Sequence, residues 1–221
     1  QVAAGVCGGL IFVCLDPQES LEEYLGEMGP RLETLPVARA TTFHEYVYDI
    51  DANWKLTYDN FQENYHLRFP NPKVSPVLVL GARRHAPRMA ADGILNHPEG
   101  RNYFALFPNF FLFGSPGQHF LHTVLPLGPE KSRGVIRIYW IGEDGNASTR
   151  YAREAAMATV RDIHSEDVNV IIGGQRGISS GALEHVHFQE KEVLCRHLIK
   201  VVEDTVEAYK AEMEAAGEQG A

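Results

Sequence analysis

Residues 53–71 read NWKLTYDNFQENYHLRFPN, and this stretch predicts one helix with two different faces. Four aromatic residues recur at helical spacing and form an apolar stripe: Trp54, Tyr58, Phe61 and Tyr65. Three polar residues lie together on the opposite side: Asp59, Glu63 and His66. On spacing alone, such a polar side is more often a solvated helix face than a functional site.

The ends of this helix are marked by a capping residue and by prolines. Asp51 is the expected N-cap, because a side-chain oxygen there accepts hydrogen bonds from the first helical N–H groups. Pro70 and Pro72 end the helix, since proline lacks the N–H donor and restricts the residue before it. His66 is therefore expected in the last turn, and Asn71 in the extended chain beyond it.

The same stretch resembles the iron-site helix in the catalytic domain of Rieske non-heme iron oxygenases. That family carries Asn-Trp-Lys, then an acidic residue and Asn, then Asp or Glu, then Tyr-His, with a second His five positions after the first. The matching residues here are Asn53-Trp54-Lys55, Asp59-Asn60, Glu63 and Tyr65-His66. The sequence departs from the family at Asn71, which takes the place of the second His, although the Pro72 that often follows is present.

A second helix is predicted over residues 148–172. Its apolar stripe consists of Val160, Ile163, Val170 and Gly174. Asp167 falls within this stripe, and a carboxylate on an apolar face is unfavourable unless it is paired or bound to a metal. By itself Asp167 is better interpreted as capped or salt-bridged. In the resembled family, however, the carboxylate ligand comes from a late Glu-Asp pair followed by Gln-Arg-Gly, here Glu166-Asp167 and Gln175-Arg176-Gly177.

The resemblance implies a mononuclear ferrous iron site. Its ligands would be His66, Asn71 and Asp167, in the manner of a two-histidine, one-carboxylate set with open positions for oxygen and substrate. Glu63 would be the bridging carboxylate of the catalytic machinery. It would orient a ligand histidine and lie on the electron route from a neighbouring subunit. The competing interpretation of Glu63 is an ordinary helix-surface glutamate.

Asn71 leaves three interpretations open. A carboxamide oxygen is a weak ligand for ferrous iron compared with imidazole. The chain is then a ligand variant of an active enzyme, a natural homologue with an Asn-supported site, or a domain that has lost its metal. Among the remaining histidines, His164 is the best spare ligand, because it lies one helical turn before Asp167.

Composition excludes several classes of protein. The 221 residues carry 20 basic and 29 acidic side chains, a formal charge of −9, which argues against unaided binding of nucleic acid. No apolar run approaches the roughly 18 residues of a membrane span. The three cysteines form no metal-binding or disulfide pattern, and no signal peptide opens the sequence, so a cytoplasmic location is expected.

The other segments predict an antiparallel sheet and a final helix. Residues 10–15 are expected to form a buried strand and residues 21–35 a helix-rich connector, while residues 76–100 are interpreted as loop. Residues 43–50 alternate, with Tyr46, Tyr48 and Ile50 on one face. Further strands are expected at 103–114, 119–127 and 134–142, joined as a meander with a turn at 128–134. Residues 188–215 predict a long helix that buries Leu194, Leu198, Val202, Val206 and Tyr209.

The sequence is therefore interpreted as one α+β catalytic domain, residues 1–221. The resemblance implies a helix-grip fold of the Bet v 1/START type, with a curved antiparallel sheet, packed helices and an internal cavity. The family's Rieske domain binds a two-iron, two-sulfur cluster through a Cys-x-His and Cys-x-x-His pair, and this pair does not occur here. That domain is expected to be missing or separate.

The implied function is oxygen activation at iron, to hydroxylate or demethylate a small organic substrate such as an aromatic compound. Expected partners are dioxygen, the substrate and an electron donor, which would be a Rieske domain, a ferredoxin or a reductase. A homotrimer is expected from the family. Neither nucleic acid nor a membrane is expected as a partner. The alternative function is a metal-poor, non-catalytic helix-grip domain that binds a small molecule.

Overall fold

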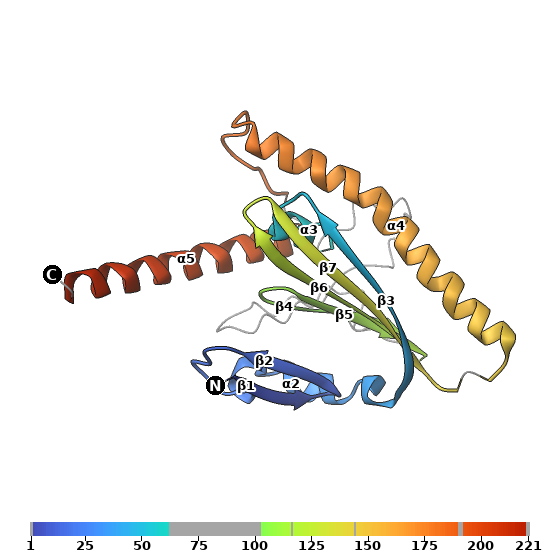
Figure 1. The fold of residues 1–221 in the computed structure, drawn as a ribbon. Coiled ribbons are helices and arrows are strands. Elements are labelled where there is room, and N and C mark those ends of the chain that lie inside the picture. Colours follow the sequence, from blue (N-terminus) through green and yellow to red (C-terminus); the bar gives the residue numbers. More distant parts are fainter. Residues whose placement is uncertain (1, 62–102, 116, 144, 190–191, 220–221) are drawn as a thin grey trace.

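A five-stranded antiparallel sheet forms the centre of the computed structural model, which describes residues 2–61, 103–115, 117–143, 145–189 and 192–219 (Figure 1). The strands lie in the order β3-β7-β6-β5-β4. Their bounds are β3 Ala40–Ile50, β4 Tyr103–Leu106, β5 Phe110–Ser115, β6 Gln118–Gly128 and β7 Lys131–Ile141. The predicted meander is confirmed, because β4 to β7 pair with their neighbours in chain order. The expected single strand at 103–114 is wrong: a turn that contains a cis Phe107-Pro108 bond divides it into β4 and β5.

The strand register assigns side chains to the two faces of the sheet. Tyr48 pairs with Gly134, and Ile136 pairs with His122. Because side chains alternate along a strand, one face receives the even-numbered residues of β3, β6 and β7. The alternation predicted for residues 43–50 is confirmed, since Tyr48 and Ile50 are buried while Phe43 and Val47 are exposed.

Two helices pack on this face. α3 spans Trp54–Asp59 and α4 spans Ala147–Ser179. Figure 1 shows α4 running along the sheet beside β3. Buried residues of α4 and of the sheet share one hydrophobic cluster: Tyr48, Ile50, Ala52, Phe120, Ile136, Ile138, Trp140, Met157 and Ile171. This arrangement of an antiparallel sheet and packed helices agrees with the predicted α+β helix-grip class.

The predicted buried stripe of α4 is wrong. Ile163 and Val170 are 51% and 71% exposed. The residues that are buried instead are Arg153, Met157, His164, Ile171 and Gln175. The real buried face is rotated by about 100° on the helix, the angle of one residue, and it includes Gln175, which accepts a hydrogen bond from Asn53 N at the start of α3. Asp167 therefore lies at the edge of the buried face and not within an apolar stripe.

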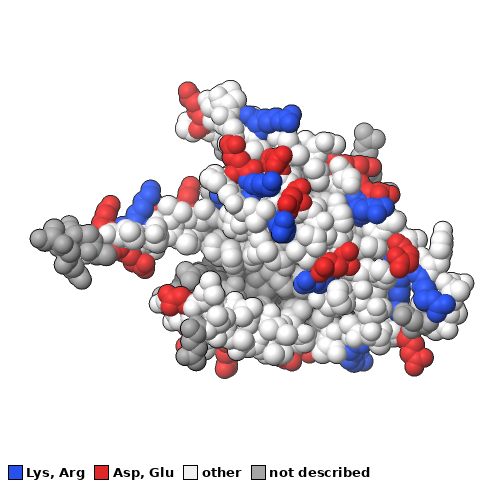
Figure 2. Space-filling model, viewed as in Figure 1, with Lys and Arg blue, Asp and Glu red and all other residues white. Residues whose placement is uncertain are grey.

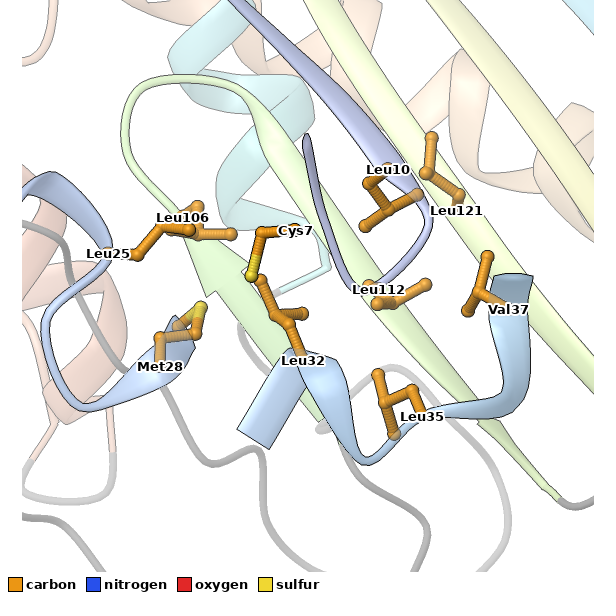
Figure 3. Close-up of a cluster of buried hydrophobic side chains, with 10 residues drawn as sticks. All are labelled: Cys7, Leu10, Leu25, Met28, Leu32, Leu35, Val37, Leu106, Leu112 and Leu121. Atoms are coloured by element: carbon orange, nitrogen blue, oxygen red, sulfur yellow. The ribbon is translucent and has the colours of Figure 1, made fainter. Parts of the chain in front are cut away.

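The β4-β5-β6 part of the opposite face packs against the first 39 residues. These contain β1 Ala3–Cys7, β2 Leu10–Cys14, α1 Leu21–Leu25, α2 Met28–Glu33 and a 3-10 turn, η1, Pro36–Arg39. Figure 3 shows the cluster they form with the sheet: Cys7, Leu10, Leu25, Met28, Leu32, Leu35, Val37, Leu106, Leu112 and Leu121. The predicted helix-rich connector at 21–35 is confirmed. The strand expected at 10–15 is present as β2, but the expectation that it is buried is wrong, because Ile11, Val13 and Leu15 are exposed.

The last helix, α5, spans Val193–Gln219 and extends away from the sheet (Figure 1). Its first turns are buried through Cys195 and Leu198. The prediction that Val206 and Tyr209 are buried is wrong, since the described part of the chain does not cover them and they are 45% and 61% exposed. None of the helices in the described ranges combines the length and hydrophobicity needed to cross a bilayer. Lys and Arg alternate with Asp and Glu on the face shown in Figure 2.

Candidate functional site

Only part of the sequence motif that predicts a metal site lies within the residues that the structure describes. Asn60 and Asp167 belong to the described residues, whereas Glu63, His66 and Asn71 lie outside them. The expected sharing of one metal by His66 and Asp167 therefore stays a prediction. Within the described ranges, no group of three or more His, Cys, Asp or Glu side chains could hold a metal ion.

Asp167 contacts the C-terminal end of α3. The Nδ2 amide of Asn60 donates a hydrogen bond of 3.1 Å to Asp167 Oδ2. Asn60 is the C-cap of α3, three residues before Glu63, so the expectation of one unbroken helix up to Pro70 is wrong. Asp167 is half-buried rather than on the outer surface. The late carboxylate and the motif helix, more than 100 residues apart in sequence, thus meet at one place.

The N-terminal end of α3 is held by Asn53, so the prediction that Asp51 is the N-cap is wrong. Asn53 Oδ1 accepts a hydrogen bond from Lys55 N at 3.0 Å, and Asn53 N donates to Gln175 Oε1 at 2.8 Å. Asp51 precedes the buried Ala52, whose carbonyl accepts from Ser132 Oγ. The chain therefore turns after Asp51, and the helix begins two residues later than expected.

Two contacts consequently fix α3 against α4. Gln175 of α4 binds the N-terminal end of α3, and Asp167 binds its C-terminal end. The two elements run antiparallel, because the earlier α3 residue contacts the later α4 residue. Gln175 also donates to Ser179 Oγ at 2.8 Å, so its side chain has little freedom. This pairing sets the place where the motif leaves α3.

A buried polar cluster lies beside Asp167. Tyr48 Oη and His122 Nε2 share a hydrogen bond of 2.8 Å. The ring of His164, one helical turn before Asp167, is 4.0 Å from the Tyr48 ring between centroids. Gly134 leaves room for the Tyr48 side chain over β7, because a Cβ at position 134 would lie 2.0 Å from the Tyr48 ring. Tyr48 can therefore cross β7 and reach His122 on β6.

Three nitrogen atoms of this cluster are buried without a hydrogen-bond partner among the described residues. They are His122 Nδ1 and both ring nitrogens of His164. His44 provides a contrast, because its Nδ1 accepts from Trp140 Nε1 at 2.8 Å and its Nε2 lies 3.0 Å from Glu154 Oε1. An unsatisfied buried polar group costs about 1–3 kcal/mol, so the two buried histidines do not serve stability.

Both histidines are uncharged at neutral pH. Burial lowers the pKa of His122 to about 3, and the nearby His164 adds to this effect. Burial also lowers the pKa of His164 to about 4, although the Asp167 carboxylate acts in the opposite direction. Burial, then Tyr46 and Asp167, raise the pKa of Tyr48. The cluster is thus neutral and faces one carboxylate.

The sequence identified only part of this cluster. The sequence predicts His164 as a spare ligand, but no motif singles out His122. The alternation of β6 carried a signal, since His122 shares a face with Phe120 and Val124. Its pairing with Tyr48 depends on the register of β3, β7 and β6, which no single segment encodes.

A family model and several solved structures are similar to this chain, and they point to the same family. The sequence matches the family described as the ring hydroxylating alpha subunit, catalytic domain, over residues 37–84 and 79–208. The structure of a quaternary ammonium Rieske monooxygenase, described for carnitine oxidation by gut microbiota and inter-subunit electron transfer, is similar, with a TM-score of 0.65 and 16% identity. It covers 91% of this chain and 61% of its own chain.

Further solved structures show the same fold. The quaternary ammonium Rieske monooxygenase CntA in complex with an inhibitor has a TM-score of 0.58 at 20% identity and covers 80% of this chain and 51% of its own. NdmA of Pseudomonas putida CBB5 has a TM-score of 0.52 at 13% identity, and the match covers 95% of this chain and 62% of NdmA. The chain thus spans about half to three-fifths of these relatives. No curated protein sequence matches.

Proposed function

Because this chain belongs to the family of ring-hydroxylating alpha-subunit catalytic domains, we propose that it is the oxygenase domain of a Rieske-type non-heme iron oxygenase. Its reaction is the hydroxylation or demethylation of a small organic molecule with dioxygen. The observation that carries the proposal is the hydrogen bond between Asn60 and Asp167. It joins the motif helix to the carboxylate that the motif requires.

The proposed iron ligands are Asp167, His66 and Asn71. The chemistry of this donor set fits ferrous iron, since carboxylate and imidazole with open positions suit non-heme iron(II). Asn60 holds one oxygen of Asp167, which fixes the orientation of the carboxylate. Iron, when bound, would supply the activation of dioxygen.

The electrons would come from a Rieske cluster on another domain or subunit. Glu63 is the residue proposed to orient the ligand His66 and to face that donor. One relative is described for inter-subunit electron transfer, which supports an assembly of several copies, as in the expected homotrimer. The described relatives act on or bind small molecules: CntA is in complex with L-carnitine and with gamma-butyrobetaine, and a mutant of NdmA is with caffeine.

The second candidate function is a small-molecule binding domain without redox chemistry. Asn71 favours it, because a neutral amide in place of imidazole weakens a ferrous iron site. The unpartnered nitrogens of His122 and His164 are compatible with either function.

Anaerobic titration with ferrous iron separates the two candidates. Wild type and Asp167→Asn are compared by calorimetry, with Asp162→Asn as a matched control, since Asp162 lies on the same helix and is exposed. Removal of a direct ligand should weaken iron binding by at least about 100-fold, because loss of outer-shell partners alone costs about 10–100-fold. Equal affinities in wild type and Asp167→Asn, or no binding by either, would leave the binding domain as the function.

A further inference from the structure

The Tyr48–His122–His164 cluster has hydrogen-bonding capacity that the proposed iron chemistry does not use. His122 is 0% exposed and His164 is 2% exposed. In the neutral form, an imidazole has one N–H donor and one acceptor nitrogen. His164 therefore presents one donor and one acceptor, and His122 presents one further group at Nδ1, without partners in the described ranges.

Aromatic rings enclose these nitrogen atoms. Phe61 contacts the His122 ring edge-on at 4.5 Å between centroids and stacks on His164 at 6.3 Å. Further rings lie within about the same distance of one or other histidine: Tyr46, Phe111 and Phe120. Aromatic surroundings of this kind suit a flat, apolar body with few polar groups, as in small-molecule sites generally.

The charged and hydrogen-bonding groups around the cluster argue against anionic ligands and against quaternary cations. The arginines of β7 lie on the other face of the sheet, where Arg133 and Arg137 pair with Asp49 and Glu45. No basic side chain is therefore at hand to neutralise an anionic ligand among the described contacts of the cluster. A quaternary cation offers no acceptor to the N–H of His164, so it would leave that donor unsatisfied.

No complete metal site surrounds these nitrogens within the described part of the chain. The described residues contain no group of three His, Cys, Asp or Glu side chains that could hold a metal ion. His122 also uses Nε2 for Tyr48. A neutral group with both a donor and an acceptor, such as a carboxamide or a hydroxyl, satisfies His164 completely.

We propose that His164, supported by Tyr48 and His122, recognises a neutral hydrogen-bonding group on an aromatic or similarly flat substrate and directs it toward Asp167. The identification of the ligand as a substrate rests on the proposed function, but the binding site itself does not. His164 would thus be a specificity-determining residue. Ligands of equal size that carry a charge in place of this group would bind less tightly.

The test uses three probes of similar size with the metal-free 221-residue chain: benzamide, benzoate and benzyltrimethylammonium. Calorimetry should show saturable binding of benzamide and weaker binding of both ions. The imidazole nitrogen NMR signals of His122 and His164 should shift with benzamide. His164→Leu should weaken benzamide binding about tenfold, in the range for loss of a buried hydrogen-bond partner. His164→Asn, which keeps a donor and an acceptor, should recover most of it.

His185→Leu is the matched control, because His185 is exposed between α4 and α5 and should leave binding unchanged. The proposal is overturned if benzamide does not bind, if either ion binds as tightly, or if His164→Leu binds benzamide like wild type. It is also overturned if His164→Leu lowers ferrous iron affinity as Asp167→Asn does, since His164 would then be a ligand. Benzamide binding without iron binding would contradict the proposed oxygenase and leave this inference standing.

Discussion

The two faces of the central sheet are built from different side chains and serve different ends. One face packs against the first 39 residues mainly through aliphatic and sulfur-containing side chains, with Phe12, Tyr24 and Phe110 beside them. The other face places Tyr48, His122 and His164 among aromatic rings, with Asp167 at the edge. Buried apolar groups are satisfied by contact alone, whereas buried imidazoles need partners. The difference separates a face that stabilises the fold from one suited to a ligand.

The aliphatic face is tightly closed by the β1–β2 turn. Gly8 and Gly9 have φ angles of 58° and 78°, which favour glycine in a two-residue hairpin. A Cβ on Gly8 would lie 2.5 Å from the carbonyl oxygen of Leu32. The turn therefore sits directly on α2, and Leu32 and Met28 are fully buried beneath it. The buried cluster of this face is built from apolar side chains in close contact.

The largest effect on stability is expected from Leu32→Ala. Leu32 is 0% exposed, and truncating a buried leucine costs about 2–5 kcal/mol through lost contacts and a residual cavity. Urea unfolding measures the change, with Leu15→Ala as the control because Leu15 is exposed. Affinity for ferrous iron and for benzamide should stay the same in folded Leu32→Ala. A change in either affinity would show that the two faces are coupled, and the comparison would fail.

The second prediction concerns acid stability of the histidine face. The folded-state pKa values of about 4 for His164 and about 3 for His122 lie below the 6.5 of an exposed imidazole. The unfolded chain therefore binds protons that the folded chain does not, and stability falls as pH decreases below about 6.5. Above that pH the contribution is complete. For His164 the loss between pH 7 and pH 4 is about 3 kcal/mol.

Urea unfolding at several pH values of wild type and His164→Leu measures this loss. The variant should be less sensitive to acid by about 3 kcal/mol over this range, and at pH 7 it should be as stable as wild type or more so, because replacing an unsatisfied polar group can stabilise. Identical pH dependence in the two proteins would mean that His164 is not buried in its neutral form.

The parts of the fold that repeat a regular pattern could be predicted from the sequence. The alternation of β3 and the meander both follow from local periodicity. The face of α4 could not, because Ile163 and Val170 are apolar yet exposed, while His164 and Gln175 are polar yet buried. Their burial depends on Tyr48 and Asn53, which lie more than 100 residues away.

The candidate site shows the same division. Asp167 is predicted as a ligand only through the resemblance, and that role stays a prediction, while its contact with Asn60 is observed. His122 had no motif to mark it, and its partner is reached only across Gly134. Residues whose function depends on a neighbour from another strand are invisible to a reading of single segments.

The smallest effect, and the sharpest test of the site face, is expected from Asn71→His. An amide oxygen is a poorer ligand for ferrous iron than imidazole, so the substitution should add a strong third ligand to His66 and Asp167. Iron affinity should rise by at least about tenfold, or about 1.4 kcal/mol. Anaerobic titration calorimetry measures the gain.

Asn64→His is the matched control, because it adds an imidazole to the same stretch at a position outside the ligand motif. Combining Asn71→His with Asp167→Asn should abolish the gain, since both residues act on one ion. Urea unfolding of the metal-free variant should match wild type, as the aliphatic face is untouched. An unchanged affinity would mean that residue 71 does not coordinate iron, and the chain would then be better described as a small-molecule binding domain.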